Sequence, residues 1–391
     1  MNLSTRIISL GVLAMFALVW PWSGVAWAQA EKPRLSVDLR QTATAGILKV
    51  VAARCGTNYV IRERANDLLL SATFSDLTCD EAFAYIASQA GLIQRRSVDG
   101  RTAIFRDPEH SKEPDVWPNL GSGSAQTASV NISLDFKQAD VRDLVKIIAA
   151  RAGVNILLHK VVRGNLSCYF NETPWYEALA ALAVACNVEA EWCGSTVIVG
   201  ERRDMAFMRL PEYSLNNVSA PRRSLNVHDL DLREAFGLAA RAFGRDFITG
   251  VGVRGNITVS LNDITEDELL PLLAHSNGFD TMRYGGLWII DDPRHIPELK
   301  NRIVERVVET ATAGIRLSFH DASLPDVIRL AAKQVSCPVK TDASSNKRVT
   351  LDIGHLDAVS VLRVLAAVAG LSIQEGVDGI TMFEAHDPKS F

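Results

Sequence analysis

Apolar and polar positions follow one sequence of patterns that occurs four times along the chain. The clearest copy opens with an alternating strand that places Ile132, Leu134 and Phe136 on one face. A helical stripe follows, formed by Val141, Leu144, Val145, Ile148 and Ala152. Two strands, a second helix and two short strands complete the copy. The pattern predicts an α+β fold in which each copy has the order βαββαββ and packs two helices on small sheets.

The four copies are also related in sequence. LSVDLRQTATAGILKVVAARCGTNYVI, from Leu35, aligns without a gap with ISLDFKQADVRDLVKIIAARAGVNILL, from Ile132. A third copy starts at Ser224 and a fourth at Ile315, and each spans about 70 residues. We call these copies units 1 to 4. Because one sequence pattern is repeated, we expect four tandem domains of one type.

Local start signals set the boundaries of the units. Thr78 with Glu81, and Thr265 with Glu268, have the spacing of capping boxes at the start of the second helix. We predict a signal segment at 1–30, units at 31–107, 132–201, 224–292 and 315–386, and linkers at 108–131, 202–223 and 293–314.

The three linkers differ in composition. Residues 108–131 contain three prolines and a Gly-Ser-Gly-Ser run, which is typical of a flexible linker, so unit 1 is expected to be the most independent. Residues 202–223 carry Met205 and Leu210, whose apolar side chains are expected to pack on a neighbouring unit. Residues 297–311 read as a short amphipathic helix, with a strand as the alternative.

The N-terminus has the features of an export signal. Arg6 is the only charged residue before Glu31, and an apolar run of about 14 residues follows it. This run is short for a membrane anchor, which needs about 20 residues. Small residues then offer cleavage after Ala28 or after Ala30, and we favour the bond between Ala30 and Glu31. The mature protein is therefore expected to be soluble and periplasmic.

Charge and motifs give little sign of catalysis. The formal net charge is −4, which disfavours nucleic acid and anionic membrane surfaces as partners. The sequence has no G-x-S-x-G, H-E-x-x-H or C-x-x-C motif. Gly250–Gly255 matches G-x-G-x-x-G, but a strand pattern follows it where a dinucleotide site needs a helix. We predict no catalytic, cofactor-binding or metal-binding residues.

Disulfides are possible in an exported chain that has six cysteines. Cys55 closes the first helix of unit 1 and Cys79 opens the second. If the two strands between them form an antiparallel hairpin, the two cysteines meet, so we predict a Cys55–Cys79 disulfide. Within unit 2, a Cys168–Cys186 bond is possible, but the third cysteine, Cys193, leaves the pairing open. In unit 4, Cys337 is expected to be a small buried apolar residue.

Unit 2 resembles the short N-terminal domain of secretins and TonB-dependent transducers, above all the version in type IV pilus secretins. The matching features are the opening S-L-D-F-K-x-A-D, the R-G-N turn, and Pro174-Trp175 followed by Glu177-Ala-Leu. The other units keep the frame with weaker identity, and Cys79 stands at the position of Trp175. The resemblance implies periplasmic docking domains. The secretin barrel has no counterpart up to Phe391, so it does not imply a pore.

Two classes of function follow from these observations. The first is a periplasmic, non-enzymatic scaffold whose repeats dock envelope proteins of a secretion, type IV pilus or TonB-type system, such as a secretin. It would neither insert into the membrane nor bind nucleic acid. The alternative is an envelope enzyme or small-ligand-binding protein with an unrecognised site. A deep pocket with convergent titratable groups would favour the alternative, and four similar shallow modules favour the scaffold.

Overall fold

The computed structural model describes residues 33–62, 68–108, 117–121, 130–210, 220–303, 314–335, 338–343, 346–376 and 379–384. The predicted signal segment and its cut between Ala30 and Glu31 lie outside these residues. Within them, no helix has the length and apolar character needed to cross a membrane.

The α+β class and the order βαββαββ are confirmed in all four units. Unit 1 consists of β1 (Arg34–Ala43), α1 (Thr44–Cys55), β2 (Asn58–Arg62), β3 (Leu69–Thr78), α3 (Cys79–Ala90), β4 (Ile93–Arg96) and β5 (Thr102–Arg106). Unit 2 consists of β6 (Asn131–Asp140), α4 (Val141–Ala152), β7 (Asn155–Leu158), β8 (Asn165–Pro174), α5 (Trp175–Cys186), β9 (Glu189–Cys193) and β10 (Thr196–Gly200).

Units 3 and 4 repeat this order, and a short helix precedes each of units 3 and 4. Unit 3 consists of β11 (Arg222–Asp231), α8 (Leu232–Ala242), β12 (Asp246–Thr249), β13 (Asn256–Thr265), α9 (Glu266–Ser276), β14 (Asp280–Tyr284) and β15 (Leu287–Asp291). Unit 4 consists of β16 (Leu317–Ser323), α11 (Leu324–Ala332), β17 (Val339–Thr341), β18 (Arg348–Ile353), α12 (Ala358–Val368), β19 (Leu371–Gly376) and β20 (Gly379–Glu384). The short helices are α6 (Arg202–Met208) and α10 (Ile296–Ile303). The helix predicted in the third linker is therefore present in the part that is described, and the strand alternative is not.

The capping boxes form as predicted. Thr78 and Glu81 bond reciprocally at the start of α3, and Thr265 and Glu268 do the same at the start of α9. Each box satisfies backbone N–H groups that a helix start leaves without an intrahelical partner. Helix starts of this kind were therefore readable from local sequence alone.

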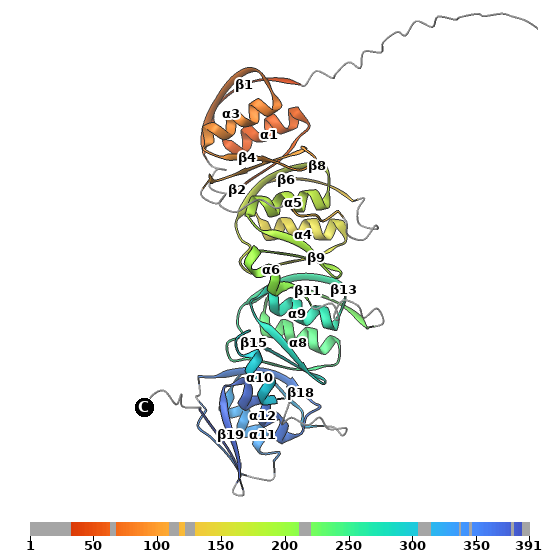
Figure 1. Ribbon diagram of the computed structural model, residues 1–391, viewed down its shortest axis with the longest axis vertical. Coiled ribbons are helices and arrows are strands. Elements are labelled where there is room, and N and C mark those ends of the chain that lie inside the picture. The colour runs from red at the N-terminus through yellow and green to blue at the C-terminus, as the bar shows by residue number, and fades with distance from the viewer. Residues whose placement is uncertain are drawn as a thin grey trace, which may run out of the picture.

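The strands pair across unit boundaries, which the sequence did not lead us to expect. One five-stranded sheet has the order β4-β5-β2-β8-β6, so that three strands of unit 1 join two strands of unit 2. β2 runs antiparallel to β8, with Tyr59 opposite Tyr169. A second sheet, β14-β15-β12-β18-β16, joins units 3 and 4 in the same way, with Phe247 opposite Asp352. Helix pairs and sheets therefore alternate along the long axis of the molecule (Figure 1).

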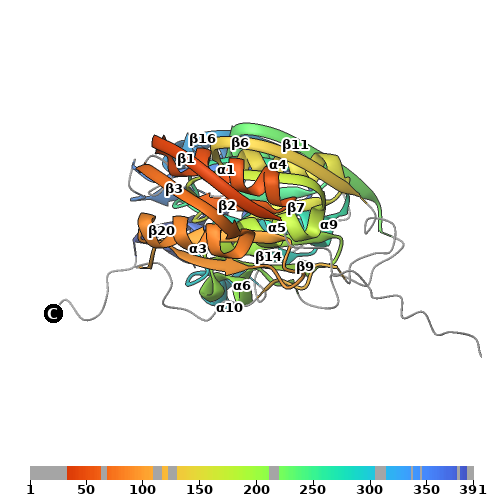
Figure 2. The same cartoon turned by 90° about the horizontal axis from the view of Figure 1, so that it is seen from above.

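The junction between units 2 and 3 is built differently. Here the three-stranded sheet β7-β10-β9 and the two-stranded sheet β11-β13 are separate. Viewed from above, the units overlie one another as layers of one stack (Figure 2). The middle junction therefore keeps the stacking, but in the described residues it lacks the backbone ladder that ties the other two junctions together.

The hydrophobic cores also cross the unit boundaries. One cluster packs Val60 and Ile104 of unit 1 together with Trp175 of unit 2. Another packs Leu157 of unit 2 with Phe236 of unit 3. The expectation that unit 1 is the most independent unit is wrong, because its central sheet is covered on one face by the helices of unit 2.

Between the two ends of the first linker, the structure describes residues 117–121, which contact unit 2. In the short part that is described, Leu120 is buried and Trp117 packs against the core of unit 2. The indole Nε1–H of Trp192 donates to the carbonyl oxygen of Leu120 at 3.1 Å. These apolar residues therefore hold residues 117–121 to unit 2, and most of the other residues of the predicted flexible linker at 108–131 lie outside the described residues. In the second linker, Met205 and Leu210 are buried between units 2 and 3, in agreement with the expectation.

Candidate functional site

The candidate functional sites of this molecule are the junctions between units. A polar side chain at one equivalent position makes hydrogen bonds across each of the three junctions. This side chain belongs to the first residue of the second strand of the unit, which is β2, β7 or β12. That residue lies 14 positions after the first residue of the preceding helix. Asn58 Oδ1 accepts a hydrogen bond from the backbone N–H of Asn171 at 3.0 Å. Asn155 Oδ1 accepts from the N–H of Asn262, and its Nδ2 donates to the Asn262 carbonyl, both at 2.8 Å. We call this contact the junction clasp.

The third clasp uses a carboxylate. Asp246 Oδ2 accepts from the N–H groups of Gly354 at 3.0 Å and His355 at 2.9 Å, and its Oδ1 lies 2.8 Å from His355 Nδ1. In unit 4, the same count from the helix start reaches Pro338, which offers no polar side chain. The clasp therefore occurs at the three positions where another unit follows. We did not single out these residues in the sequence, although each stands two positions after a helix-closing glycine: Gly56, Gly153 and Gly244.

Two arginines strengthen the outer junctions. Arg106 of β5 is 2% exposed, and its Nη1 donates to the carbonyl of Val184 at 3.1 Å in the last turn of α5. A cation at this point complements the negative end of the helix dipole. Between units 3 and 4, Arg233 bonds to Asp231 at 2.9 Å and also contacts Asp321. The hydrogen bond from Arg233 lowers the pKa of Asp231 below its usual range.

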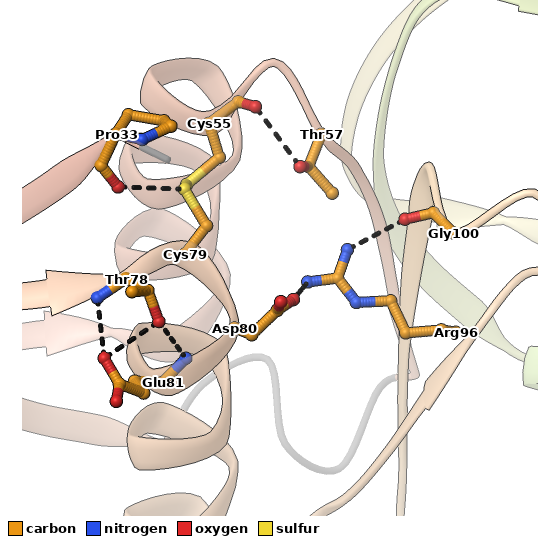
Figure 3. Close-up of a disulfide and its surroundings, with 9 residues drawn as sticks. All are labelled: Pro33, Cys55, Thr57, Thr78, Cys79, Asp80, Glu81, Arg96 and Gly100. Atoms are coloured by element: carbon orange, nitrogen blue, oxygen red, sulfur yellow. Dashed lines mark hydrogen bonds and ion pairs between the residues drawn. A yellow bond between two sulfur atoms is a disulfide. The ribbon is translucent and has the colours of Figure 1, made fainter. Parts of the chain in front are cut away.

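The structure joins Cys55 and Cys79 by a disulfide, with the two Cα atoms 6.0 Å apart (Figure 3). The hairpin that we invoked to bring them together does not form. β3 pairs with β1, while β2 pairs with β5 and β8. The two cysteines meet because the C-terminal end of α1 lies next to the N-terminal end of α3 in space, beside the Thr78–Glu81 capping box. The hydrogen bonds that Glu81 accepts from Thr78 lower the pKa of its carboxyl.

Removing the disulfide is expected to lower the free energy of unfolding by roughly 3 kcal/mol, because the cysteines are 24 residues apart and close a loop of that length. The measurement is urea unfolding of the Cys55→Ser/Cys79→Ser variant, with Cys193→Ser as a matched control. Thiol titration of the unfolded, unreduced chain should find neither Cys55 nor Cys79 reactive. Two extra reactive thiols would contradict the pairing.

The other described cysteines are not bonded. Cys168, Cys186 and Cys193 are free and buried, so the Cys168–Cys186 bond that we left open does not form. Burial raises the pKa of Cys168 to about 12 and that of Cys186 to about 11. These groups are therefore thiols at neutral pH and act as small apolar residues. Cys337 lies outside the described residues.

The candidate motifs and ligand groups give no further site. Within the described ranges, no group of three or more His, Cys, Asp and Glu side chains is placed to hold a metal ion. Residues 250–255, which match G-x-G-x-x-G, form the connection between β12 and β13 as expected. This glycine-rich segment therefore leads into a strand rather than into the helix N-terminus that a pyrophosphate requires.

A buried histidine lies at the middle junction, immediately after β7. His159 is 4% exposed, and its Nδ1 lies 3.3 Å from Asp204 Oδ2 on α6. Burial lowers the pKa of His159, and the carboxylates of Asp204 and Glu201 oppose that effect. The imidazole is therefore held mainly neutral in the folded protein.

Acidification is expected to weaken the fold through His159. Its folded pKa lies below the value of about 6.5 that it has when unfolded, so the unfolded chain binds more protons as the pH falls below about 6.5. The free energy of unfolding should fall by at most about 1.4 kcal/mol per pH unit from this group. The measurement is urea unfolding between pH 7 and 5 of the wild type and of His159→Gln. An equal pH slope in both proteins would contradict the assignment.

Known proteins that are similar to part of this chain include two PilQ proteins of Neisseria. The type IV pilus biogenesis and competence protein PilQ of Neisseria meningitidis serogroup A is 30% identical over 101 residues, which is 23% of this chain and 13% of that protein. PilQ of Neisseria gonorrhoeae is 31% identical over 90 residues, 22% of this chain and 12% of that protein. No family model matches the chain. The chain therefore has a distant similarity to type IV pilus secretins, over a small part of their length.

Proposed function

We propose that this chain is a non-catalytic docking protein of the cell envelope, exported to the periplasm, which binds components of a type IV pilus or other secretin-associated machine. The observation that carries the proposal is the repeated unit itself. Four units of one type stack into an elongated body, with a shared sheet at the first and third junctions, and part of the chain is similar to PilQ. A body of this kind presents surfaces at several heights along one axis.

Both ends of the stack support this role. In unit 1, β3 pairs only with β1 among the described strands, whereas its counterpart β8 also pairs with β2 of the preceding unit. In unit 4, β17 pairs only with β20, whereas its counterparts β2 and β12 also pair with the following unit. Strand edges are established docking surfaces for other proteins. The edge at β17 is short and carries the exposed Lys340, a feature that discourages unspecific pairing.

The test is site-specific photo-crosslinking in intact cells. The crosslinking residue replaces Thr73 on β3 or Lys340 on β17, both exposed, and Val98 in the exposed β4–β5 turn serves as the control position. We expect adducts with an envelope protein, such as a pilus secretin, from the strand positions and not from Val98. The absence of adducts at both strand positions would contradict docking at these edges. Release of dye from liposomes by the purified chain would contradict a role without membrane insertion.

A further inference from the structure

The middle junction holds two strand edges that face each other without a backbone ladder. These are the edges of β7 in unit 2 and β13 in unit 3. The corresponding edges pair at both other junctions, β2 with β8 and β12 with β18. At the middle junction the clasp from Asn155 to Asn262 is present, but no ladder between β7 and β13 continues from it in the described residues.

The direction of individual backbone groups follows from two hydrogen bonds. The N–H of His159 donates to Val199 of β10 at 2.8 Å, so it points away from β13. Because backbone groups alternate sides along a strand, those of Ile156 and Leu158 point toward β13. The N–H of Asn262 points toward Asn155, so by the same alternation those of Ser260 and Thr258 point toward β7.

These backbone groups border a cleft of about 440 Å³. Ile156 and Leu158 line one side, Thr258 and Ser260 line the other, and Val145 and Ala149 of α4 contribute apolar surface. At the first junction, the residues equivalent to Ile156 and Leu158 are Tyr59 and Ile61, which pair with Tyr169 and Ser167 of β8. The cleft therefore occupies the position that the ladder fills elsewhere in the chain.

We infer that this cleft binds an extended segment of a partner protein, which adds to the free edge of β7 as an antiparallel β-strand. Among the described strands, β7 pairs only with β10, so its other edge offers main-chain N–H and C=O groups at every second residue, which match a peptide strand. The interface already exists twice in the molecule, where β8 and β18 bind the equivalent edges. On β18, the alternate residues Val349, Leu351 and Ile353 are buried, so the bound segment should likewise carry apolar side chains at alternate positions. The inference rests on the proposed function in taking the occupant to be a protein segment.

The free edge can be tested without a partner, by amide hydrogen exchange of the full chain. We expect the amides of Ile156 and Leu158 to exchange at least about tenfold faster than those of Tyr59 and Ile61, which are ladder-bonded. Equally slow exchange at all four amides would show that β7 is already paired in solution, and would overturn the inference.

Binding can be tested with a fluorescent peptide of residues 346–354, whose central part is the β18 strand that pairs with β12. We expect saturable binding to the full chain, with exchange at Ile156 and Leu158 slowed on binding. Leu158→Pro removes a cleft-facing N–H, and Ala149→Trp fills the cleft; each should weaken binding by about tenfold or more. Ala150→Trp, the exposed neighbour on α4, is the matched control and should bind normally.

Two outcomes with the unmodified peptide would overturn the strand site. One is no binding at about 1 mM peptide. The other is binding that neither Leu158→Pro nor Ala149→Trp weakens relative to Ala150→Trp. A peptide with proline in place of Thr350 cannot form the full ladder. If it bound as tightly as the unmodified peptide, the contact would be made by side chains only, which would also contradict the strand site. If the peptide does not bind but crosslinks from Thr73 or Lys340 are found in cells, the cleft proposal fails and the proposed function stands. If the peptide binds normally but neither position gives crosslinks, docking at the two ends is contradicted and the cleft proposal stands.

Discussion

Replacing Val60 with aspartate is expected to lower the free energy of unfolding by about 3–5 kcal/mol and to loosen unit 2 as well as unit 1. Val60 is 0% exposed and lies in unit 1, but it packs in the cluster that surrounds Trp175 of unit 2. An aspartate there would be buried without a cation to pair with, which is strongly unfavourable. The measurement is urea unfolding together with amide exchange in α5, which should become faster although the substitution is in the preceding unit.

The same substitution at Val98 is the matched control for this prediction. Val98 lies in the turn between β4 and β5 and is 80% exposed, so Val98→Asp should change the free energy of unfolding by no more than about 0.5 kcal/mol. If Val60→Asp made amide exchange faster only in unit 1, the conclusion that units 1 and 2 share a core around Val60 would be wrong.

Replacing Asp246 with alanine is expected to cost about 3–4 kcal/mol and to separate unit 4 from unit 3. The Asp246 carboxylate accepts hydrogen bonds from the backbone N–H groups of Gly354 and His355 and contacts the His355 ring. Alanine would leave these donors without their acceptor at a largely buried position. The measurement is urea unfolding, with limited proteolysis between units 3 and 4 as a second readout, which should become faster.

Asparagine at position 246 provides the control that the chain itself suggests, because Asn58 and Asn155 form the clasp at the other two junctions. Asp246→Asn keeps one acceptor oxygen, so it should recover at least half of the stability lost in Asp246→Ala. Equal losses in the two variants would show that the negative charge, and not the hydrogen-bonded clasp, stabilises this junction.

The sequence predicted the local structure of each unit because the signals for it are local. The capping boxes at Thr78 and Thr265 set helix starts, and alternation set the strands. The strand pairings were not predicted correctly, and the hairpin between β2 and β3 that we invoked does not form. An alternating pattern shows which face of a strand is buried but not which strand lies beside it. One signal was available. Tyr59-Val60-Ile61 is a continuous apolar run, which is typical of a strand covered on both faces, whereas Lys340 and Thr341 of β17 are exposed.

The candidate site was less predictable than the fold. The pairing of Cys55 with Cys79 was predicted, but the reason given for it was wrong, because the hairpin between β2 and β3 does not form. The clasp residues read as ordinary strand-end polar residues until the following unit is placed beside them. Arg106 reads as a surface charge, and it is buried only because the end of α5 lies over β5. The clasps and the Arg106 contact join residues that the repeat places in different units, so no pattern within one unit contains them.

The absence of a ladder at the middle junction gives the described sheets a period of two units. From the N-terminal side, the sheets have two, five and three strands, and then two, five and three again. Under tension applied along the stack, units 2 and 3 should therefore separate first, between β7 and β13. The two halves of the stack would each retain a complete five-stranded sheet. A body of this kind would yield by one defined step at its midpoint while both halves stay folded.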